Sequence, residues 1–474
     1  MSGLFHTLGI GAESLFVSRQ GVDTTGHNIA SAQVPGYSRQ RLNLATRDPL
    51  QRGSIMMGNG AFLKSIGRVH DQFVENQLNI AGHEVGMNDS RADSLKGLES
   101  IFSPELTASV QDEVNSLFSA VRELSNNPEE LSVRTNLKEA AANVASAFAR
   151  VDTGLRRAQD DHNGMVAGEV KEANDMLDTL AKLNVRIGEM ECGGVNGQAN
   201  DLRDEREGLL RDLSQKMEVR YYEDKSGGLV IRGPGETTLV EGAQHSFFDL
   251  ERNSDGMTNI TVSSFENKNP RVINDKIGTG KWRSLLEIRD ETIPNLLDKN
   301  NEMAATIIRT FNEIHREGFG TGEYGGSNGR NFFEDVKDQS TAAQDMRLTD
   351  AIVASPDAIS GGSSPFAPGD NVIANKLLTI QSSKLFDDGH TSLSEFYAGY
   401  VSNLGLDSQR ADHIKDASQL IYTGLNNKKE AISGVSLDEE ATNLLKWQHC
   451  FSASSKLITT VDEMMDTVLN LKRN

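Results

Sequence analysis

The first candidates for chemistry in this sequence are glycine-rich segments with the spacing of phosphate-binding loops. Residues 320–325, Gly-Thr-Gly-Glu-Tyr-Gly, match the GxGxxG pattern of a dinucleotide-binding turn. That turn requires a strand before it and a helix after it, whereas this segment follows an expected helix and runs into more loop. Residues 278–281, Gly-Thr-Gly-Lys, resemble part of a phosphate loop, but Asp275 and Trp282 stand where that loop has its first glycine and its serine or threonine. Neither segment therefore predicts a nucleotide site.

A serine nucleophile and a metal site are the next candidates. Residues 325–329 match the GxSxG spacing of a nucleophile elbow around Ser327, but an elbow lies between a strand and a helix, and both flanks here are loop. The ten histidines are scattered, without metal-ligand spacing. Residues 201–206, Asp-Leu-Arg-Asp-Glu-Arg, form a charge run whose simplest interpretation is a solvated helix face. The sequence predicts no catalytic, cofactor-binding or metal-binding residue, and no enzyme.

The composition is that of a polar chain with several domains. Its 474 residues correspond to about three domains. The formal net charge of −20 argues against a nucleic-acid partner, and no apolar run is long enough to span a membrane. Cys192 and Cys450 suggest no disulfide framework. Because the amino end lacks the features of a secretory signal, we expect a cytosolic protein or one exported without a cleaved signal peptide.

Both ends of the chain carry apolar residues at heptad-like spacing. Residues 1–32 are expected to form one helix, with an apolar stripe at Leu4, Leu8, Leu15, Val22 and Ile29 and small residues between them at Gly11, Ser18 and Thr25. The last helix, over about 436–474, carries one stripe at Leu457, Val461, Met464, Val468 and Leu471 and a second at Leu444, Phe451, Ile458 and Met465.

Such stripes require partner helices. We expect the two terminal helices to pair as a coiled coil, with Leu4, Leu8, Leu15 and Val22 facing the closing helix. The second stripe of the closing helix is then available to a further neighbour. Packing of both ends on a central domain is the simpler alternative. Pairing within one chain and pairing between subunits both stay open.

The residues between the two ends predict a helical middle with a β insert. Three apolar stripes, near 110–124, 137–155 and 176–190, have the spacing of antiparallel bundle helices. Strand-like pieces separated by glycine-rich turns predict a small antiparallel β module over 217–275. The later expectations are a helix over about 282–317, a loop over 318–331, an irregular region over 345–368 with a strand-like Ile352-Val353, and helices from about 371 onward with a break near 432–434.

The expected fold class is mainly α with a small β module (α+β). It combines terminal helices paired as a coiled coil, a helical-bundle middle and an antiparallel β insert. Three domains are expected: residues 1–40 with 433–474 as the terminal coiled coil, residues 41–216 with 281–432 as the helical middle, and residues 217–280 as the β module.

Three segments resemble the flagellar rod, hook and hook-associated family. The first is the signature of Asn28, Ile29 and Ala30 followed by Pro35, Gly36, Tyr37, Ser38, Arg39 and Gln40, in which Ser31 and Val34 depart slightly from the usual form. The second is residues 200–206, Asn-Asp-Leu-Arg-Asp-Glu-Arg. The third is the closing segment that begins at residues 433–441, Ser-Gly-Val-Ser-Leu-Asp-Glu-Glu-Ala.

The resemblance implies a structural subunit of the bacterial flagellum, in the ring at the junction between hook and filament. It further implies an extracellular location after export and assembly through the terminal helices. The implied partners are further copies of the chain, the hook protein, a second junction protein toward the filament, and a cytosolic export chaperone on the carboxyl-terminal helix. No cofactor, nucleic acid or membrane is expected. A hook or distal-rod structural protein is the alternative.

Overall fold

The computed structural model describes residues 2–52, 55–103, 108–192, 199–224, 227–254 and 256–471, and most of them are helical. The helices are α1 (Ser2–Ser31), α2 (Gln72–Phe102), α3 (Val110–Asn126), α4 (Leu131–Glu191), α5 (Asn200–Lys216), α6 (Lys281–Glu287), α7 (Ile293–His315), α8 (Ala342–Asp345), α9 (Asp350–Ala354), α10 (Val372–Ser382), α11 (Leu393–Ser433) and α12 (Leu437–Leu471). No helix in these ranges is long and apolar enough to cross a membrane.

The strands form small antiparallel sheets. Near the amino end, β1 (Gln40–Thr46) pairs with β4 (Ala61–Arg68), and β2 (Leu50–Arg52) pairs with β3 (Ile55–Met57). One further sheet has the order β5-β6-β7-β8, from β5 (Arg220–Glu223), β6 (Leu229–Gly233), β7 (Thr237–Glu241) and β8 (Gln244–His245). Another has the order β11-β10-β9, from β9 (Phe247–Arg252), β10 (Thr258–Ser263) and β11 (Arg271–Val272). A mainly α fold with a β module is thus confirmed.

The chain divides into two compact units. The first consists of Met1–Gly86, Glu169–Gly280 and Ala417–Asn474, and the second of Met87–Gly168 and Lys281–Asp416. The three-domain division drawn from the sequence stays a prediction.

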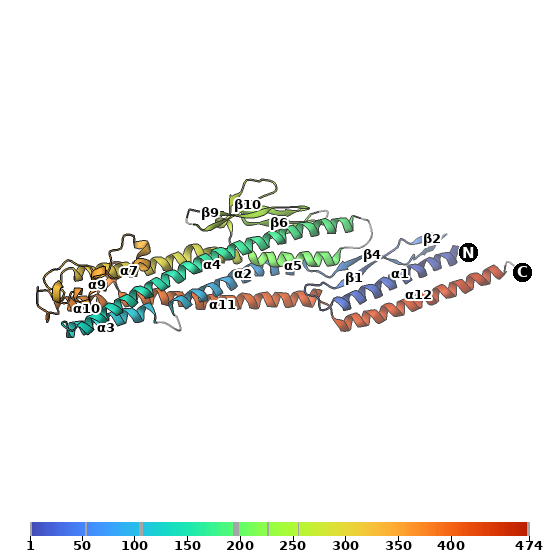
Figure 1. Ribbon diagram of the computed structural model, residues 1–474. Helices are drawn as coiled ribbons and strands as arrows, with labels where there is room; N and C mark the ends of the chain where they lie inside the picture. The colour runs from blue at the N-terminus through green and yellow to red at the C-terminus, as the bar shows by residue number, and fades with distance from the viewer. Residues whose placement is uncertain are drawn as a thin grey trace. The chain divides into compact units, whose positions relative to one another are not determined.

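In the first unit, α1 and α12 lie side by side, so that α1 begins where α12 ends (Figure 1). The chain turns after α1 at residues 35–37, where Gly36 adopts the left-handed φ of 80° that glycine tolerates best. The β1–β4 ladder then returns along α1, against which both strands pack. The paired terminal helices expected from the sequence are therefore present within one chain.

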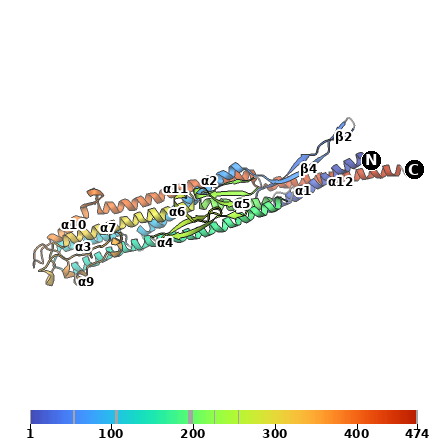
Figure 2. The ribbon, with the colours of Figure 1, turned by 90° about the horizontal axis from the view of Figure 1, so that it is seen from above.

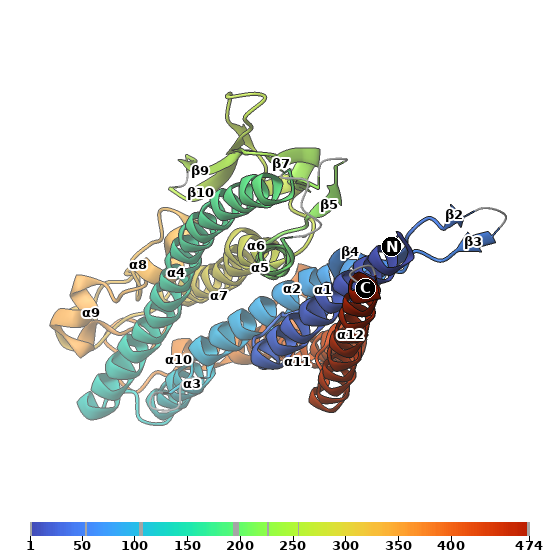
Figure 3. The same ribbon diagram turned by 90° about the vertical axis from the view of Figure 1, so that its right-hand side faces the viewer.

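The β module of the first unit lies against the last part of α4 (Figure 3). Asn184 holds one sheet there, because its Nδ2 donates to Leu229 O at 2.8 Å and its Oδ1 accepts from Leu229 N at 3.0 Å. Asn174 holds the other sheet in the same way, through both polar backbone atoms of Phe248. Each pair of bonds substitutes for one step of a strand ladder. The β strands are thus fixed to the helix by polar as well as apolar contacts.

The second unit is a helical bundle with an aromatic core. Helix α10 packs on α3 and α7 (Figure 2). The buried core includes four phenylalanines that are fully buried: Phe148, Phe311, Phe332 and Phe333. The rings of Phe311 and Phe332 lie 5.0 Å apart, centroid to centroid, within the range of favourable aromatic pairs.

Two of the three stripes expected on separate bundle helices lie on one continuous helix. Helix α4 runs from Leu131 to Glu191, so its two stripes cannot be antiparallel neighbours. The stripe continues between them through Val166, Val170 and Ala173, which are all buried. No proline interrupts this stretch, and the glycines within it only weaken a helix by about 1 kcal/mol each.

Two local expectations were wrong. The pair Ile352-Val353 lies in the short helix α9 rather than in a strand. Ile352 is buried while Val353 is 56% exposed, as on one turn of an amphipathic helix. The second difference is a short hairpin of β12 (Lys384–Phe386) and β13 (Thr391–Ser392) within the region expected to be helical. In both places the segment is too short for periodicity to decide between helix and strand.

Each unit contains a buried histidine that must stay neutral. His83, in the first unit, accepts a hydrogen bond at Nε2 from Val219 N. His315, in the second, accepts at Nε2 from Ser360 N and lies with Nδ1 2.8 Å from Arg330 O, to which it donates. Burial lowers the pKa of each to about 4. Protonation would place a hydrogen on Nε2, which would then face the backbone N–H as a second donor and lose the hydrogen bond that it accepts.

We predict that acid destabilises both units through these histidines. Between about pH 6.5 and about pH 4 the unfolded state binds more protons than the folded state, so stability falls as pH falls, by up to about 1.4 kcal/mol per pH unit for each histidine. Urea unfolding at about pH 7 and about pH 5 measures the slope. His315→Gln should reduce it, whereas His413→Gln, at an exposed position, should not. An unchanged slope in His315→Gln contradicts the assignment.

Candidate assembly site

The contact between α1 and α12 is an antiparallel seam of small side chains. Ser14 Oγ lies 2.6 Å from Ser454 Oγ. A Cβ atom added to Gly21 would lie 2.3 Å from Cδ2 of Trp447, so the indole ring rests directly on the glycine backbone. The α1 side of the seam consists of Gly11, Ser14, Ser18, Gly21, Thr25 and Asn28. Small residues at steps of three and four let the two helix axes approach closely.

The larger side chains of the apolar stripe expected on α1 are only partly buried, and their place against α12 stays a prediction. Leu4, Leu8, Leu15, Val22 and Ile29 are all half-buried. Of the positions that fill the seam, the sequence had singled out Gly11, Ser18 and Thr25. A step pattern of fours and threes fits two adjacent helix faces about equally well, and side-chain size decides between them.

On α12 the two expected stripes border the seam and partly enter it, since Ile458 and Leu457 lie against Gly11. Val461 is buried, with 3% exposure, and Leu444 and Ile458 are half-buried. At 100° per residue, two sets of side chains flank the positions that face α1. One is the Met464 flank, consisting of Leu457 and Met464, which are 39% and 51% exposed. The other is the Phe451 flank, consisting of Leu444 and Phe451, the latter 42% exposed. The side chain of Leu471 lies outside the described residues.

The carboxamide of Asn28 joins the two ends of the chain. Its Nδ2 donates to Gln40 O and to Glu440 Oε2, both at 2.9 Å. Its Oδ1 accepts from Gln40 N at 2.9 Å and from the Tyr37 hydroxyl at 2.8 Å. An asparagine side chain has two N–H donors and two lone pairs, so all four positions are used. The side chain is 1% exposed.

Arg39 completes this contact between α1 and the start of α12. Its Nη1 lies 2.6 Å from Glu439 Oε2 and its Nε lies 2.8 Å from Glu440 Oε1. Its backbone N donates to Ser433 O at 2.8 Å, at the break between α11 and α12. We call Asn28, Tyr37, Arg39, Gln40 and Glu440 the terminal clip. The clip explains why the signature near residue 28 and the closing segment occur together.

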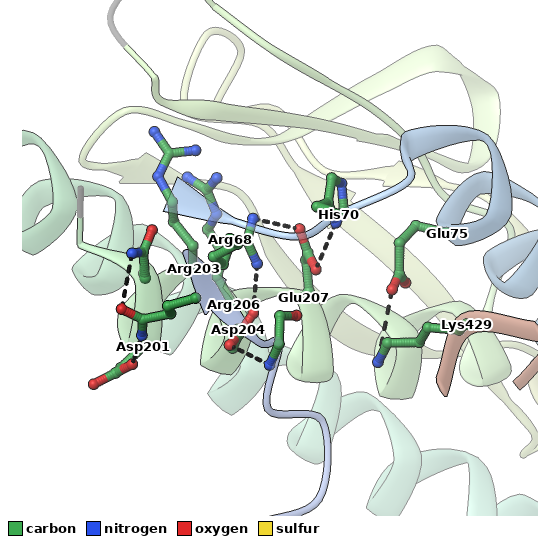
Figure 4. A network of polar contacts seen from close by, with 12 residues as sticks. Arg68, His70, Glu75, Asp201, Arg203, Asp204, Arg206, Glu207 and Lys429 are labelled. Atoms are coloured by element: carbon green, nitrogen blue, oxygen red, sulfur yellow. Dashed lines mark hydrogen bonds and ion pairs between the residues drawn. The ribbon is translucent and has the colours of Figure 1, made fainter. Parts of the chain in front are cut away.

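The charge run at 201–206 belongs to the same network (Figure 4), and it is solvated only in part: Asp201 and Glu205 are exposed, whereas Asp204 and Arg206 are buried. Asp204 is 8% exposed and accepts from Ser38 N at 2.8 Å and from Arg68 Nη1 at 2.6 Å. Asp201 accepts from Gln40 Nε2 at 2.7 Å. Arg206 is 1% exposed and donates to Asn184 Oδ1. The expectation of local i, i+4 pairs was wrong because these charges pair with distant segments.

Burial and charge together set the protonation of this network. Burial, with the negative charges of Asp201, Asp204 and Glu440, raises the pKa of the Tyr37 hydroxyl, which therefore keeps the proton that it donates to Asn28. Burial alone would raise the pKa of Glu207, but the charge and hydrogen bonds of Arg68 lower it. For Asp204 burial prevails, and its pKa is raised despite Arg68.

One group of side chains in the described ranges has the proximity of a metal site. The ligand atoms of His70, Glu75 and Glu207 lie within 4.8 Å of one another. Both carboxylates, however, pair with cations of the protein: Arg68 lies 2.9 Å from Glu207, and Arg211 lies 3.0 Å from Glu75. Lys429 lies 3.6 Å from Glu75 as well. With the charge already balanced, the group fits a structural ion-pair network.

The segments with nucleotide-like or nucleophile-like spacing have no such context in the structure. Residues 320–325 follow α7 and lead into a short 3-10 turn at Gly322–Tyr324. The hydroxyl of Ser327 accepts from Arg330 Nη1 at 2.7 Å, so a cation rather than a base faces it. Sequence reasoning missed Ser14, Gly21 and Trp447. The spacing of small residues from Gly11 to Asn28 is the signal that would have found them.

The paired ends, the clip and the charge-balanced network are features of a structural protein whose two terminal segments pack together. The sequence profile of the flagellar hook-associated protein FlgK helical domain matches residues 95–333, just over half of the chain. The chain belongs to the family of flagellar hook-associated protein 1 (FlgK), and it is a non-enzymatic structural protein of the flagellar hook–filament junction.

Individual relatives agree along nearly the whole chain. The chain is 27% identical to flagellar hook-associated protein 1 of Bacillus subtilis (strain 168), over 99% of both chains. It is 21% identical to that of Escherichia coli (strain K12), over 97% of this chain and 98% of the other. Its fold is similar to the flagellar hook junction protein FlgK from Burkholderia pseudomallei, with a TM-score of 0.67 at 12% identity, covering 76% of this chain and 100% of that one.

Part of the likeness is shared more widely. Residues 431–471 match the profile of the carboxyl-terminal part of flagellar basal body rod FlgEFG proteins. This range covers α12 and the clip residue Glu440. The helical-domain match and the full-length relatives favour the junction family over the alternative of a hook or distal-rod protein.

We predict that Gly21→Ala separates α1 from α12. The added methyl would overlap the Trp447 ring, at a cost of about 1–3 kcal/mol. With Trp282→Phe in the background, Trp447 is the remaining indole, and its emission should shift to the red at lower urea than in the parent. Gly26→Ala is the matched control: nothing lies within 4 Å of its Cβ position, so it should stabilise α1 by up to about 1 kcal/mol. Equal effects of the two substitutions would refute the seam.

We predict that Asn28→Ala opens the clip. It leaves the Tyr37 hydroxyl, Gln40 N and Glu440 without their buried partner, at a cost of about 2–4 kcal/mol for several lost bonds, one of them charged. The Trp447 transition should move to lower urea while the unfolding of the second unit stays in place. Asn143→Ala, at an exposed position of α4, should move neither transition.

Proposed function

We propose that copies of this chain assemble side by side into the junction ring through the two flanks of α12. The observation that supports it is the two-sided exposure of this helix, with Met464 on one flank and Phe451 on the other. A ring subunit contacts a neighbour on each side through two different surfaces. One helix with an exposed apolar flank on each side of its internal seam meets that requirement.

The small side chains of α1 along the seam also support the proposal that assembly stabilises the terminal helices. Burial stabilises by about 25 cal/mol per Å² of apolar surface removed from water, and glycine and serine remove little. The pair α1–α12 therefore depends on the clip and on further contacts. Neighbouring copies supply those contacts when they cover the flanks.

The proposed ring also has partners along its axis. The hook protein lies on one side of the ring along the axis, and a second junction protein lies on the filament side. In this arrangement residues 1–40 with 433–474 form the inner domain, residues 41–216 with 281–432 the helical middle, and residues 217–280 an outer β module. The ring is extracellular.

A cytosolic export chaperone is proposed to cover α12 before assembly. Exposed apolar side chains such as Leu445, Met464 and Leu469, which are 57%, 51% and 57% exposed, promote aggregation unless they are covered. The same helix thus serves first the chaperone and then the neighbouring copy.

We predict that Met464→Asp blocks assembly without opening the seam. A buried unpaired carboxylate costs several kcal/mol, and each 1.4 kcal/mol is about tenfold in association. The purified variant should keep the parent's Trp447 emission, whereas cells that carry it as their only copy should form at least about tenfold fewer filaments. Val353→Asp, 56% exposed in the second unit, is the matched control and should assemble normally.

Val461→Asp, in contrast to Met464→Asp, should affect the seam as well as assembly. Because Val461 is 3% exposed in the seam, this variant should lose both the Trp447 signal and assembly. Normal filament number with Met464→Asp would overturn the assignment of its flank.

A further inference from the structure

The hairpin of β2 and β3 exposes an apolar tip that lacks a core of its own. Leu50 is 50% exposed, Ile55 66%, Met56 62% and Met57 39%. In the antiparallel register Leu50 lies opposite Met57, and alternation places Ile55 on their face. An isolated two-stranded ribbon is marginally stable in water, so an apolar face on one indicates a partner surface.

The chain's own terminal helices do not provide that surface. The base of the hairpin touches α1, where His6 Nε2 lies 3.4 Å from Gly58 O and the Cβ position of Gly60 lies 3.4 Å from Ile10. Beyond this contact β2 and β3 project sideways, away from α1 and α12 (Figure 2, Figure 3). We call residues 40–52 and 55–68 the arm.

The tip of the arm lies at the level of the Met464 flank. The pairs Ser14–Ser454 and Gly21–Trp447 set the register of the antiparallel seam. Continued toward the amino end of α1, this register places His6 beside residue 462 of α12. Copies in a ring are related by rotation about its axis and keep the same level. The tip of one copy therefore meets its neighbour near residues 457–468.

Charge favours the same contact. Within the arm, Arg68 pairs with Asp204 and Glu207, and Arg47 pairs with Glu13. The other charged residues are Arg41, Arg52, Lys64 and Asp48, a formal charge of +2 in a chain of −20. Around the Met464 flank, Asp462, Glu463 and Asp466 outnumber Lys456, a formal charge of −2 over residues 455–471. Opposite charges favour encounter and register between the two surfaces.

We propose that the arm of each copy packs its apolar tip on the Met464 flank of the next copy in the ring. The inference rests on the proposed function and names the occupant of that flank. The contact is heterologous, because the arm and the flank are different surfaces of one chain. Each copy gives an arm to one neighbour and receives one from the other, so the contact propagates around the ring.

Cysteine cross-linking between differently tagged copies tests the contact. In a Cys192→Ser, Cys450→Ser background, one chain carries Ile55→Cys and the other Met464→Cys. Both are expressed together in cells without the native gene, and isolated flagella are oxidised. Because each chain has one thiol, a mixed dimer arises only between copies. It should exceed the control pair, Val353→Cys with Met464→Cys, by at least about tenfold, since the contact raises the effective thiol concentration.

The outcomes separate this inference from the proposed function. If the unsubstituted chain fails to restore filaments in these cells, the proposed function and the arm contact both fall. If filaments form and the Ile55→Cys and Met464→Cys chains give no more mixed dimer than the control, the arm contact is overturned and the ring function stands. A cross-link from Ile55→Cys to hook protein instead assigns the arm to another partner and also overturns it. A mixed dimer above the control supports it.

Discussion

The four hydrogen bonds of the Asn28 carboxamide are the contact on which the arrangement of the chain ends depends. Through this one buried side chain they join the end of α1 to the segment that follows it and to the first turn of α12. A buried amide with all its positions used is costly to disturb, because every broken bond leaves a desolvated group behind. Arg39 and Asp204 extend the network to the α11–α12 break and to α5. The termini thus meet through polar geometry more than through apolar burial.

The seam beyond the clip has few polar contacts, and the backbones of its two helices lie close together. Glycine and serine along α1 bring α12 near, and Trp447 supplies the one large contact on Gly21. Such a seam fixes register but contributes modest apolar burial. It leaves the larger apolar side chains of α12 on two flanks, where neighbouring copies can cover them.

Much of the fold could be predicted because its signals are local. Apolar spacing of three and four identified the terminal helices and the bundle helices, and short alternating pieces between glycines identified the β module. The break after α1 followed from Pro35 and Gly36. Expectations were wrong where the local signal was short or ambiguous: Ile352-Val353 is helical, and α4 is one helix because its buried stripe continues through Val166 and Val170. The spacing within each stripe does not show whether two successive stripes belong to one helix or to two.

The sequence by itself determined the class of the protein: its three family signatures, its paired apolar ends and the lack of any motif in a catalytic context. The tertiary structure decided which residues meet. Whether Leu15 or Ser14 faces α12 depends on a rotation of about 100°, which heptad spacing leaves open and side-chain size resolves. The charge run at 201–206 became part of a partly buried network only because Ser38, Gln40 and Arg68 come from other segments to pair with it. Contacts between residues so far apart in the chain depend on the packed fold, and local pattern carries no information about them.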